Sequence, residues 1–170
     1  GGPGIDTVTY ASSATGVIID LTSNAAFDGT SVDRIVNFEN ATGSAFNDQI
    51  FGNALANILR GGPGDDLLLG EGGDDVLDGG PGADRYQGGQ GNDDYILRKG
   101  EADGDWFLTF VGNGAAPGDR VVLVGWGPLT TMVLIDPVQR LWRITDGSDS
   151  STAVVRIDGD FDPAFDLVFG

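Results

Sequence analysis

The chain has neither cysteine nor histidine, and its only lysine is Lys99. The missing cysteines exclude disulfide bonds, thiolate metal sites and a cysteine nucleophile. The missing histidines remove the commonest general base and the usual ligand of transition metals. Because the eight arginines are scattered along the sequence, no basic patch is present, and we expect no nucleic-acid partner. The inorganic chemistry that remains is that of hard cations bound through oxygen.

Long apolar runs are absent too. No stretch reaches the roughly 20 residues that span a bilayer, and the N-terminus shows no signal-peptide pattern. The sequence starts at Gly1 without a methionine, so we expect it to be a piece of a longer protein. A catalytic domain, if the parent protein has one, would then lie upstream.

Glycine and acidic residues are what the chain has in excess. Its 170 residues include 29 glycines and 26 acidic residues against 9 basic ones, which gives a formal net charge of -17. The hydrophobic content of 40% suffices for the core of one domain or two small ones. Unpaired carboxylates at this density repel one another. We therefore expect bound cations to complete the fold.

Between residues 43 and 96 a glycine returns every nine residues. The six units read GSAFNDQIF, GNALANILR, GGPGDDLLL, GEGGDDVLD, GGPGADRYQ and GGQGNDDYI. The sixth position is polar, and it is occupied by Asp48, Asn57, Asp66, Asp75, Asp84 and Asp93. The eighth is large and apolar, and it is occupied by Ile50, Leu59, Leu68, Leu77, Tyr86 and Tyr95. A fixed period of this kind predicts stacked repeats.

A nine-residue unit is too short for a helix with its connector, but it accommodates a six-residue turn and a three-residue strand. Glycine permits positive φ angles and close backbone approach in the turn, and the large apolar residue points inward from the strand. Two units then form one coil of about eighteen residues. We expect an all-β parallel β-roll, or β-solenoid, in which Ile50, Leu68 and Tyr86 stack in one sheet and Leu59, Leu77 and Tyr95 in the other.

The segments that flank the array differ from it. A further copy of the motif, GGPGIDTVT, occupies residues 1–9, and short β-branched runs between it and Gly43 predict more parallel strands, with a loop near residues 24–31. We therefore assign residues 1–96 to the roll. Residues 97–170 have longer alternating runs and all three tryptophans. They predict a second unit, an antiparallel β cap that covers the open end of the roll.

Carboxylates at equivalent positions of stacked turns come close together, with turn carbonyls beside them. Ca²⁺ accepts such mixed oxygen ligands in flexible geometry, whereas Mg²⁺ requires a stricter octahedron. Taken singly, each unit also reads as an ordinary Asp-Gly hairpin turn, but hairpin turns have no reason to keep a constant spacing. A phosphate cradle is disfavoured, because the aspartates would repel the phosphate and no long helix follows.

The units resemble the nonapeptide G-G-x-G-x-D-x-U-x of RTX (repeats-in-toxin, haemolysin-type) calcium-binding proteins. The units that start at residues 61, 79 and 88 match it in full, and the unit at residue 70 has Glu71 in place of the second glycine. The units at residues 43 and 52 depart further, with Phe46 and Leu55 in place of the fourth glycine and Asn57 in place of aspartate. We expect weaker or purely structural sites there.

The resemblance implies about three to five calcium ions, each held between turns two units apart by aspartate side chains and by carbonyls of glycine, alanine or proline. On one edge the turn of Gly61, Pro63 and Asp66 would face that of Gly80, Gly82 and Asp84, and the turn of Gly43, Ala45 and Asp48 would face that of Gly62, Gly64 and Asp66. On the other edge the turn of Gly70, Gly72 and Asp75 would face that of Gly89, Gly91 and Asp93, and a weaker site would join Gly52, Ala54 and Asn57 to Glu71, Gly73 and Asp75.

Two other acidic clusters are weaker candidates. Residues 158–166 open like an EF-hand loop with Asp158, Asp160 and Asp162, but Pro163 stands where that loop needs glycine. Asp103 and Asp105 predict a turn that leaves the roll, with a peripheral ion as the alternative. We expect neither cluster to belong to the repeat sites.

The resemblance also implies a function. An RTX module would be bacterial and secreted, would fold on binding Ca²⁺ outside the cell, and would support type I secretion and stability of a larger protein. The ending DLVFG, residues 166–170, resembles the C-terminal secretion signal of serralysin-type proteases, with a plain terminal strand as the alternative.

A second hypothesis is a calcium-dependent module that binds a polysaccharide or a cell surface, as part of an adhesin or a polysaccharide-modifying enzyme. The outward positions Phe51, Leu67 and Leu69 on one sheet, and Ile58 and Val76 on the other, form apolar stripes that either contact such a ligand or lie under the flanking segments. Catalysis within this chain is not expected, because a Ser-His arrangement is impossible without histidine.

Overall fold

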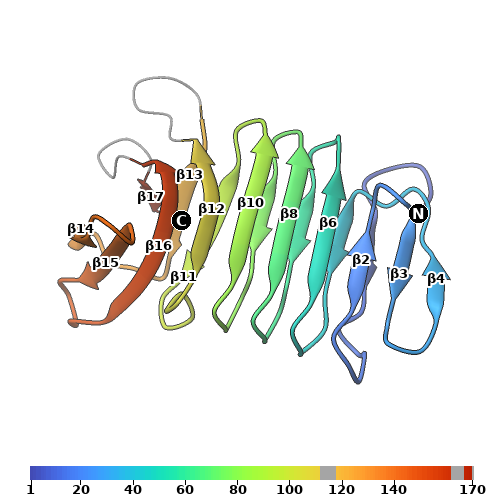
Figure 1. Cartoon of the computed structure of the whole chain (residues 1–170), viewed down its shortest axis with the longest axis horizontal. Helices are drawn as coiled ribbons and strands as arrows, with labels where there is room; N and C mark the ends of the chain where they lie inside the picture. The colour runs from blue at the N-terminus through green and yellow to red at the C-terminus, as the bar shows by residue number, and fades with distance from the viewer. Residues whose placement is uncertain (112–117, 162–166, 170) are drawn as a thin grey trace.

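The computed structural model describes residues 1–111, 118–161 and 167–169. Within these residues the regular structure consists of strands, and no helix is present that is long and apolar enough to cross a membrane. The strands form two sheets that run along the long axis of the molecule, with the two ends of the chain at opposite ends of the stack (Figure 1). The predicted all-β roll is confirmed.

The smaller sheet is parallel throughout. Its seven strands, in spatial order, are β1 (Thr7–Thr9), β5 (Asn40–Thr42), β7 (Ile58–Arg60), β9 (Val76–Asp78), β11 (Asp94–Arg98), β13 (Arg120–Val124) and β17 (Leu167–Phe169). Every neighbouring pair runs in the same direction. Parallel neighbours require a crossover connection, and here the other sheet supplies it.

The larger sheet is parallel in its middle and antiparallel at both ends. Its order is β14 (Thr130–Asp136), β15 (Leu141–Asp146), β16 (Thr152–Asp160), β12 (Trp106–Val111), β10 (Arg85–Gln90), β8 (Leu67–Gly72), β6 (Gln49–Asn53), β2 (Ile18–Asp20), β3 (Ala25–Phe27) and β4 (Val32–Arg34). From β2 to β16 the pairing is parallel. The antiparallel strands β3 and β4 close one end, and β14 and β15 close the other.

The inward side chains form two columns between the sheets. Leu68 pairs in register with Ile50 and Tyr86, and Leu77 pairs with Leu59 and Tyr95, as the nine-residue period predicts. These side chains are at most 1% exposed. The columns continue beyond the repeats, and Tyr86 stacks on Phe107 with ring centroids 4.9 Å apart. The core is therefore one continuous cluster.

The turns fit together because glycine leaves room for the neighbouring backbone. A side chain at Gly61 would collide with the carboxylate of Asp66, and Gly62 has a φ of 110°, where residues with a side chain are strained. Glu71 occupies the same second position of its unit with a φ of 75°. This departure from the repeat pattern is therefore tolerated, but at a backbone cost of about 1 kcal/mol or more.

Two expectations about the flanking segments were wrong. Residues 24–31 do not form a loop only, because β3 lies there and pairs antiparallel with β2. Residues 97–170 are not wholly antiparallel, because β12, β13 and β17 continue the parallel stack. Alternation of apolar residues indicates a half-buried strand, but it does not show whether that strand runs parallel or antiparallel to its neighbours. The predicted boundary after residue 96 falls within β11, whose neighbours on both sides are parallel.

The apolar stripes on the outer faces are half-buried. Phe51, Leu67 and Leu69 lie on β6 and β8, and Ile58 and Val76 lie on β7 and β9. The two ends of the chain extend the stack at its ends and do not cover these strands (Figure 1). Of the two alternatives for these stripes, burial under the flanking segments is therefore wrong for the described residues.

Replacement of Leu68 by alanine should lower the free energy of unfolding by about 2–5 kcal/mol, because it opens a cavity in the middle of a buried column. Leu67→Ala is the matched control, since the half-buried Leu67 side chain points outward from the same strand. Urea unfolding in excess calcium measures both variants. Equal losses for the two would contradict the assigned inward and outward faces.

Candidate functional site

Buried aspartates form a ladder along one edge of the roll. The backbone N–H of Asp48 donates to Asp66 Oδ1 at 2.7 Å, that of Asp66 to Asp84 Oδ1 at 2.9 Å, and that of Asp84 to Asp105 Oδ1 at 3.0 Å. All four side chains are buried. Each carboxylate is thus held by the turn of the preceding coil, and its position is set by the sheet register.

The opposite edge carries a second ladder of the same kind. The backbone N–H of Asn57 donates to Asp75 Oδ1 at 2.7 Å, that of Asp75 to Asp93 Oδ1 at 2.9 Å, and that of Asp93 to Asp119 Oδ1 at 3.1 Å. Asn57 takes the place of an aspartate, and its amide group donates to the Glu39 carbonyl at 2.6 Å. This edge therefore has a neutral first member.

The second carboxylate oxygen distinguishes the members of the two ladders. Oδ2 of Asp66, Asp75 and Asp93 is buried and has no hydrogen-bond partner. Buried acceptors of this kind are rare in folded proteins because each costs the free energy of its lost hydration. Three such atoms at equivalent positions of stacked turns form a donor pattern that a cation could complete.

The structure brings together all four pairs of turns that the sequence predicted. Between the turns at Gly61 and Gly79, the N–H of Gly62 donates to the Gly79 carbonyl at 2.8 Å and that of Gly64 to the Pro81 carbonyl at 2.9 Å. The turns at Gly43 and Gly61, at Gly52 and Gly70, and at Gly70 and Gly88 also approach closely, since a side chain on the first glycine of each pair would collide with the carbonyl of the second. Carbonyls therefore lie beside the carboxylates.

No group of three or more carboxylates converges among the described residues. A cation at these turns would thus be held by aspartates from two neighbouring coils together with backbone carbonyls. Mixed carboxylate and carbonyl ligands are the set that Ca²⁺ accepts. The donor set is hard and free of nitrogen or sulfur, which disfavours the common transition metals.

Burial raises the pKa of the ladder carboxyls, and the neighbouring carboxylates raise it further. The pKa rises from 3.8 to about 7 for Asp66 and Asp84, to about 8 for Asp75 and to about 6 for Asp93. Backbone hydrogen bonds oppose the shift but do not cancel it. Without a cation, these carboxyl groups therefore bind protons more tightly in the folded chain than in the unfolded chain.

Sequence reasoning missed the last member of each ladder. Asp105 follows Asp84 by 21 residues and Asp119 follows Asp93 by 26, so neither continues the 18-residue spacing. Asp105 was expected in a turn that leaves the roll, but it is buried and held by Asp84. The available signal was local, since each aspartate has an inward apolar residue two positions later, Phe107 and Val121.

The other acidic candidates have structural roles. Asp103 accepts a hydrogen bond from the backbone N–H of Val154 at 2.8 Å. Asp158 lies within the continuous strand β16, where it accepts from Trp106 Nε1 at 2.9 Å and pairs with Arg156. It therefore does not start an EF-hand loop, and Asp162 of that motif lies outside the described residues.

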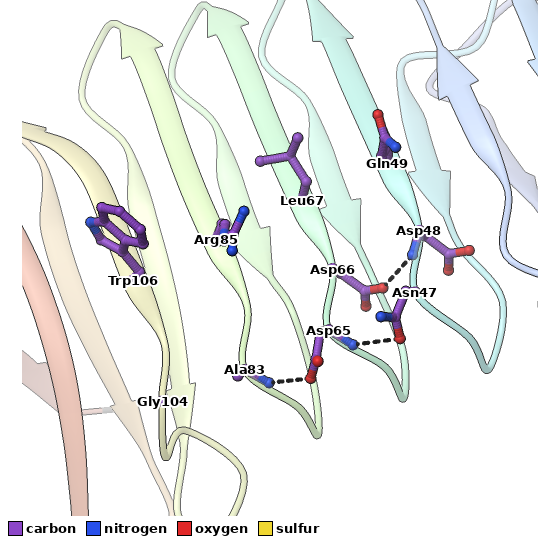
Figure 2. A pocket seen from close by; sticks show the side chains of 10 residues that line it. All are labelled: Asn47, Asp48, Gln49, Asp65, Asp66, Leu67, Ala83, Arg85, Gly104 and Trp106. Carbon is purple, nitrogen blue, oxygen red and sulfur yellow. Dashed lines mark hydrogen bonds between the residues drawn. The ribbon is translucent and has the colours of Figure 1, made fainter.

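The two acids of each Asp-Asp pair differ in environment. Asp66 is 1% exposed, whereas Asp65 lies at the surface and borders a groove of about 510 Å³. Figure 2 shows this groove between the turn residues Asn47 and Asp65 and the strand residues Arg85 and Trp106. The Asp65 carboxylate accepts from the backbone N–H of Ala83, with Oδ1 3.0 Å from the nitrogen. The outer acid thus supports the turn, and the inner acid faces the neighbouring coil.

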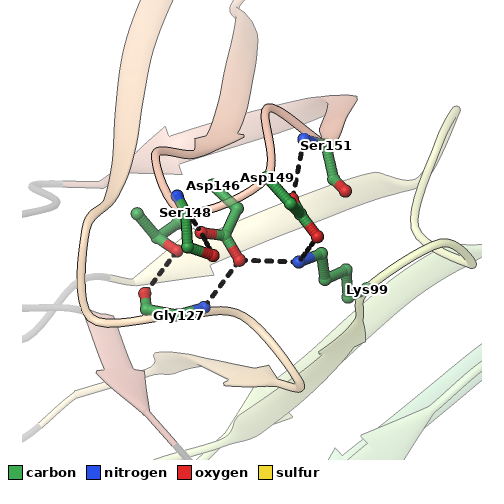
Figure 3. Close-up of polar contacts among 7 residues, drawn as sticks. Lys99, Gly127, Asp146, Ser148, Asp149 and Ser151 are labelled. Carbon is green, nitrogen blue, oxygen red and sulfur yellow. Dashed lines mark hydrogen bonds and ion pairs between the residues drawn. The ribbon is translucent and has the colours of Figure 1, made fainter.

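A third acidic group contains its own cation. Lys99, which directly follows β11, reaches the turn between β15 and β16, where its Nζ lies 2.7 Å from Asp146 Oδ2 and 2.6 Å from Asp149 Oδ2 (Figure 3). Asp146 also accepts from the backbone N–H of Gly127 and Ser148. The Lys99 ammonium, followed by these hydrogen bonds, holds the pKa of Asp146 well below its usual range. This loop needs no added ion.

The fold and these turns define a parallel β-roll with oxygen-lined edges. Residues 39–68, 51–86 and 60–95 match a family model described as the RTX calcium-binding nonapeptide repeat, in four copies. Residues 39–95 are therefore an array of RTX repeats, and the predicted resemblance is confirmed. No curated protein was found to match the chain. The match ends before Asp105 and Asp119, which only the structure connects to the array.

The metal-free fold should be more stable at pH 5 than at pH 8. The raised pKa values mean that the folded chain binds protons more tightly than the unfolded chain, so this contribution is present near pH 4 and is lost as the pH rises through about 6–8. Circular dichroism in EGTA at several pH values measures the folded fraction, which should be larger at pH 5 than at pH 8. Asp66→Asn should reduce the pH dependence more than Asp65→Asn does, and a metal-free fold that gains stability toward pH 8 would contradict the assignment.

Proposed function

We propose that this chain is a calcium-dependent folding module of a larger secreted protein. The observation that carries the proposal is the set of unpartnered buried oxygens, Oδ2 of Asp66, Asp75 and Asp93, in turns that belong to calcium-binding RTX repeats. Ca²⁺ would neutralise the carboxylates and supply the missing partner. The module itself is non-catalytic, and a catalytic or adhesive domain would lie elsewhere in the parent protein.

The ligand sets we propose are those of the four adjacent turn pairs. Aspartate side chains would contribute from Asp48, Asp66, Asp75, Asp84 and Asp93, and backbone carbonyls would contribute from the glycine, alanine and proline positions of the same turns. Support comes from the hydrogen bonds that each carboxylate accepts from the turn of the preceding coil. The pair that contains Asn57 has one carboxylate fewer and should hold its ion less tightly.

Ion binding and folding should be one process. The turns exist only when neighbouring coils are stacked, so the unfolded chain offers no site and the binding free energy stabilises the fold. At a concentration 100 times the dissociation constant, one site stabilises by about 2.7 kcal/mol, and several sites contribute together. Without calcium, the buried carboxylates oppose compaction at neutral pH.

The place of action follows from this coupling. Extracellular calcium modules work at about 10⁻⁴ to 10⁻³ M, so we propose that the chain stays unfolded inside a bacterial cell, leaves through type I secretion machinery and folds outside. Residues Leu167–Phe169 of the proposed C-terminal signal form β17, which pairs with β13. Asp166 and Gly170 of the same motif lie outside the described residues.

A second candidate function is calcium-dependent binding of a polysaccharide or cell surface. The groove on the outer face of the larger sheet favours it, because it joins the half-buried aromatic ring of Trp106 to the polar residues Asn47, Gln49 and Arg85. A glycan array at millimolar calcium tests this function with the wild type and with Leu67→Ala and Arg85→Ala, two changes inside the groove. Binding that survives both changes would contradict a site in this groove.

The main proposal is tested by calcium titration followed by circular dichroism, with EGTA and Mg²⁺ as controls. We expect a β-sheet signal that appears with Ca²⁺ and only weakly with Mg²⁺. A full signal in EGTA that calcium does not change would exclude calcium-dependent folding.

Asp75→Asn should raise the calcium concentration needed for folding by tenfold or more, because it removes a buried carboxylate shared by two turn pairs. Asp74→Asn is the control with the same loss of charge in the adjacent exposed position. The calcium midpoint from circular dichroism measures both variants. If the two midpoints shift equally, bulk charge rather than site geometry is responsible.

A further inference from the structure

The last member of each aspartate ladder is completed in a different way from the inner members. Asp66, Asp75 and Asp93 have an unpartnered buried oxygen. At the C-terminal ends, in contrast, a tyrosine hydroxyl reaches the carboxylate: Tyr86 Oη lies 3.3 Å from Asp105 Oδ2, and Tyr95 Oη lies 3.3 Å from Asp119 Oδ2. Two independent edges thus end in the same arrangement.

The position of these hydroxyls follows from a break in the repeat spacing. The first glycine of the earlier units donates its N–H to a backbone carbonyl 17 residues later, from Gly43 to Arg60 and from Gly61 to Asp78. In the last unit of each edge the next coil is displaced by an insertion, and the N–H of Gly79 donates instead to Tyr86 Oη at 3.2 Å. Gly88 donates to Tyr95 Oη at 3.0 Å in the same way.

Each hydroxyl therefore joins two groups that the insertion separates. It accepts from the glycine N–H and has one proton to donate. Tyr86 Oη is also 3.4 Å from Asp84 Oδ2, but Asp84 belongs to the proposed site with Asp66. Beside Asp105, in contrast, the next strand β16 places Arg156 opposite Trp106, so the described part of that coil offers no aspartate at the equivalent position. We therefore assign the single phenol proton to a hydrogen bond with Asp105 Oδ2. Asp105 Oδ1 already accepts from the backbone N–H of Asp84, so both of its oxygens then have a donor.

The carbonyls of the last turn on this edge are also engaged. A site between this turn and Asp105 would repeat the pattern of the array and use the carbonyls of Gly79 and Pro81. Both accept hydrogen bonds from the preceding coil, from Gly62 and Gly64. Each of these two carbonyls thus already accepts one hydrogen bond on the side of the Gly61 turn.

We infer that Tyr86 and Tyr95 terminate the calcium array, so that Asp105 and Asp119 continue the two ladders without an ion. The inference rests on the proposed calcium-binding function. It assigns a role to the aromatic residue in the eighth position of the last two units, where the earlier units have isoleucine or leucine. The phenols also extend the core, because both rings pack on Phe107.

Counting bound ions tests the inference. Native mass spectrometry at saturating calcium, supported by equilibrium dialysis, should give the same number of ions for Asp105→Asn as for the wild type, and at least one fewer for Asp75→Asn. Loss of an ion in Asp105→Asn would overturn the inference, because Asp105 would then be a ligand. A wild-type chain that binds no calcium would instead refute the proposed function.

A double-mutant cycle tests the role of the hydroxyl. Tyr86→Phe should lower the thermal midpoint by several degrees in excess calcium, with no change in the number of bound ions. In the Asp105→Asn background the same change should cost much less, because the acceptor of the phenol proton has been altered. Additive losses, or one ion fewer in Tyr86→Phe, would overturn the inference. Tyr86→Phe alone decides the point if Asp105→Asn does not fold.

Discussion

Three inner aspartates of the array, Asp66, Asp75 and Asp93, are held where the negative charge of the carboxylate lacks a partner. One oxygen accepts a backbone hydrogen bond from the preceding coil, and the other is buried without a partner. Stacking the coils to form the core therefore forces the carboxylates together, and the pKa of each one rises above its ordinary value. Apolar burial favours the same stacking. The roll combines these two terms in the units of Asp66, Asp75 and Asp93, and under the proposed function a bound cation would remove the unfavourable one as the core forms.

The geometry of the edges follows from that of the sheets. Parallel pairing with an 18-residue coil places every second unit on the same edge, so that one register fixes both the inward columns and the carboxylate ladders. A slip of one residue would turn Leu68 outward and Leu67 inward, and it would also move Asp66 away from the turn of Asp84. Packing and ion binding thus select the same register, and each reinforces the specificity of the other.

The sequence allows the array to be predicted in detail because its period carries the information. The stacking of Ile50, Leu68 and Tyr86 and the burial of Asp66 rather than Asp65 both follow from counting. Where the spacing changes, counting fails. Asp105 and Asp119 lie beyond insertions of different length, and only the paired strands show that they belong to the ladders. The direction of β3 and of the strands after residue 97 was equally inaccessible, since alternating hydrophobicity is the same for parallel and antiparallel strands.

The acidic groups of the chain differ in where their positive partner comes from. Asp146 and Asp149 have the Lys99 ammonium, which is covalently part of the protein and therefore present under all conditions. Oδ2 of Asp66, Asp75 and Asp93 has no hydrogen-bond partner among the described residues, whereas the neutral hydroxyls of Tyr86 and Tyr95 reach the last members of the ladders. A fixed ammonium cannot respond to its surroundings, whereas an ion from solution binds according to its concentration. Under the proposed function, the dependence on calcium is therefore concentrated in residues 43–96, whereas the carboxylates of the β15–β16 turn already have the Lys99 ammonium as their partner.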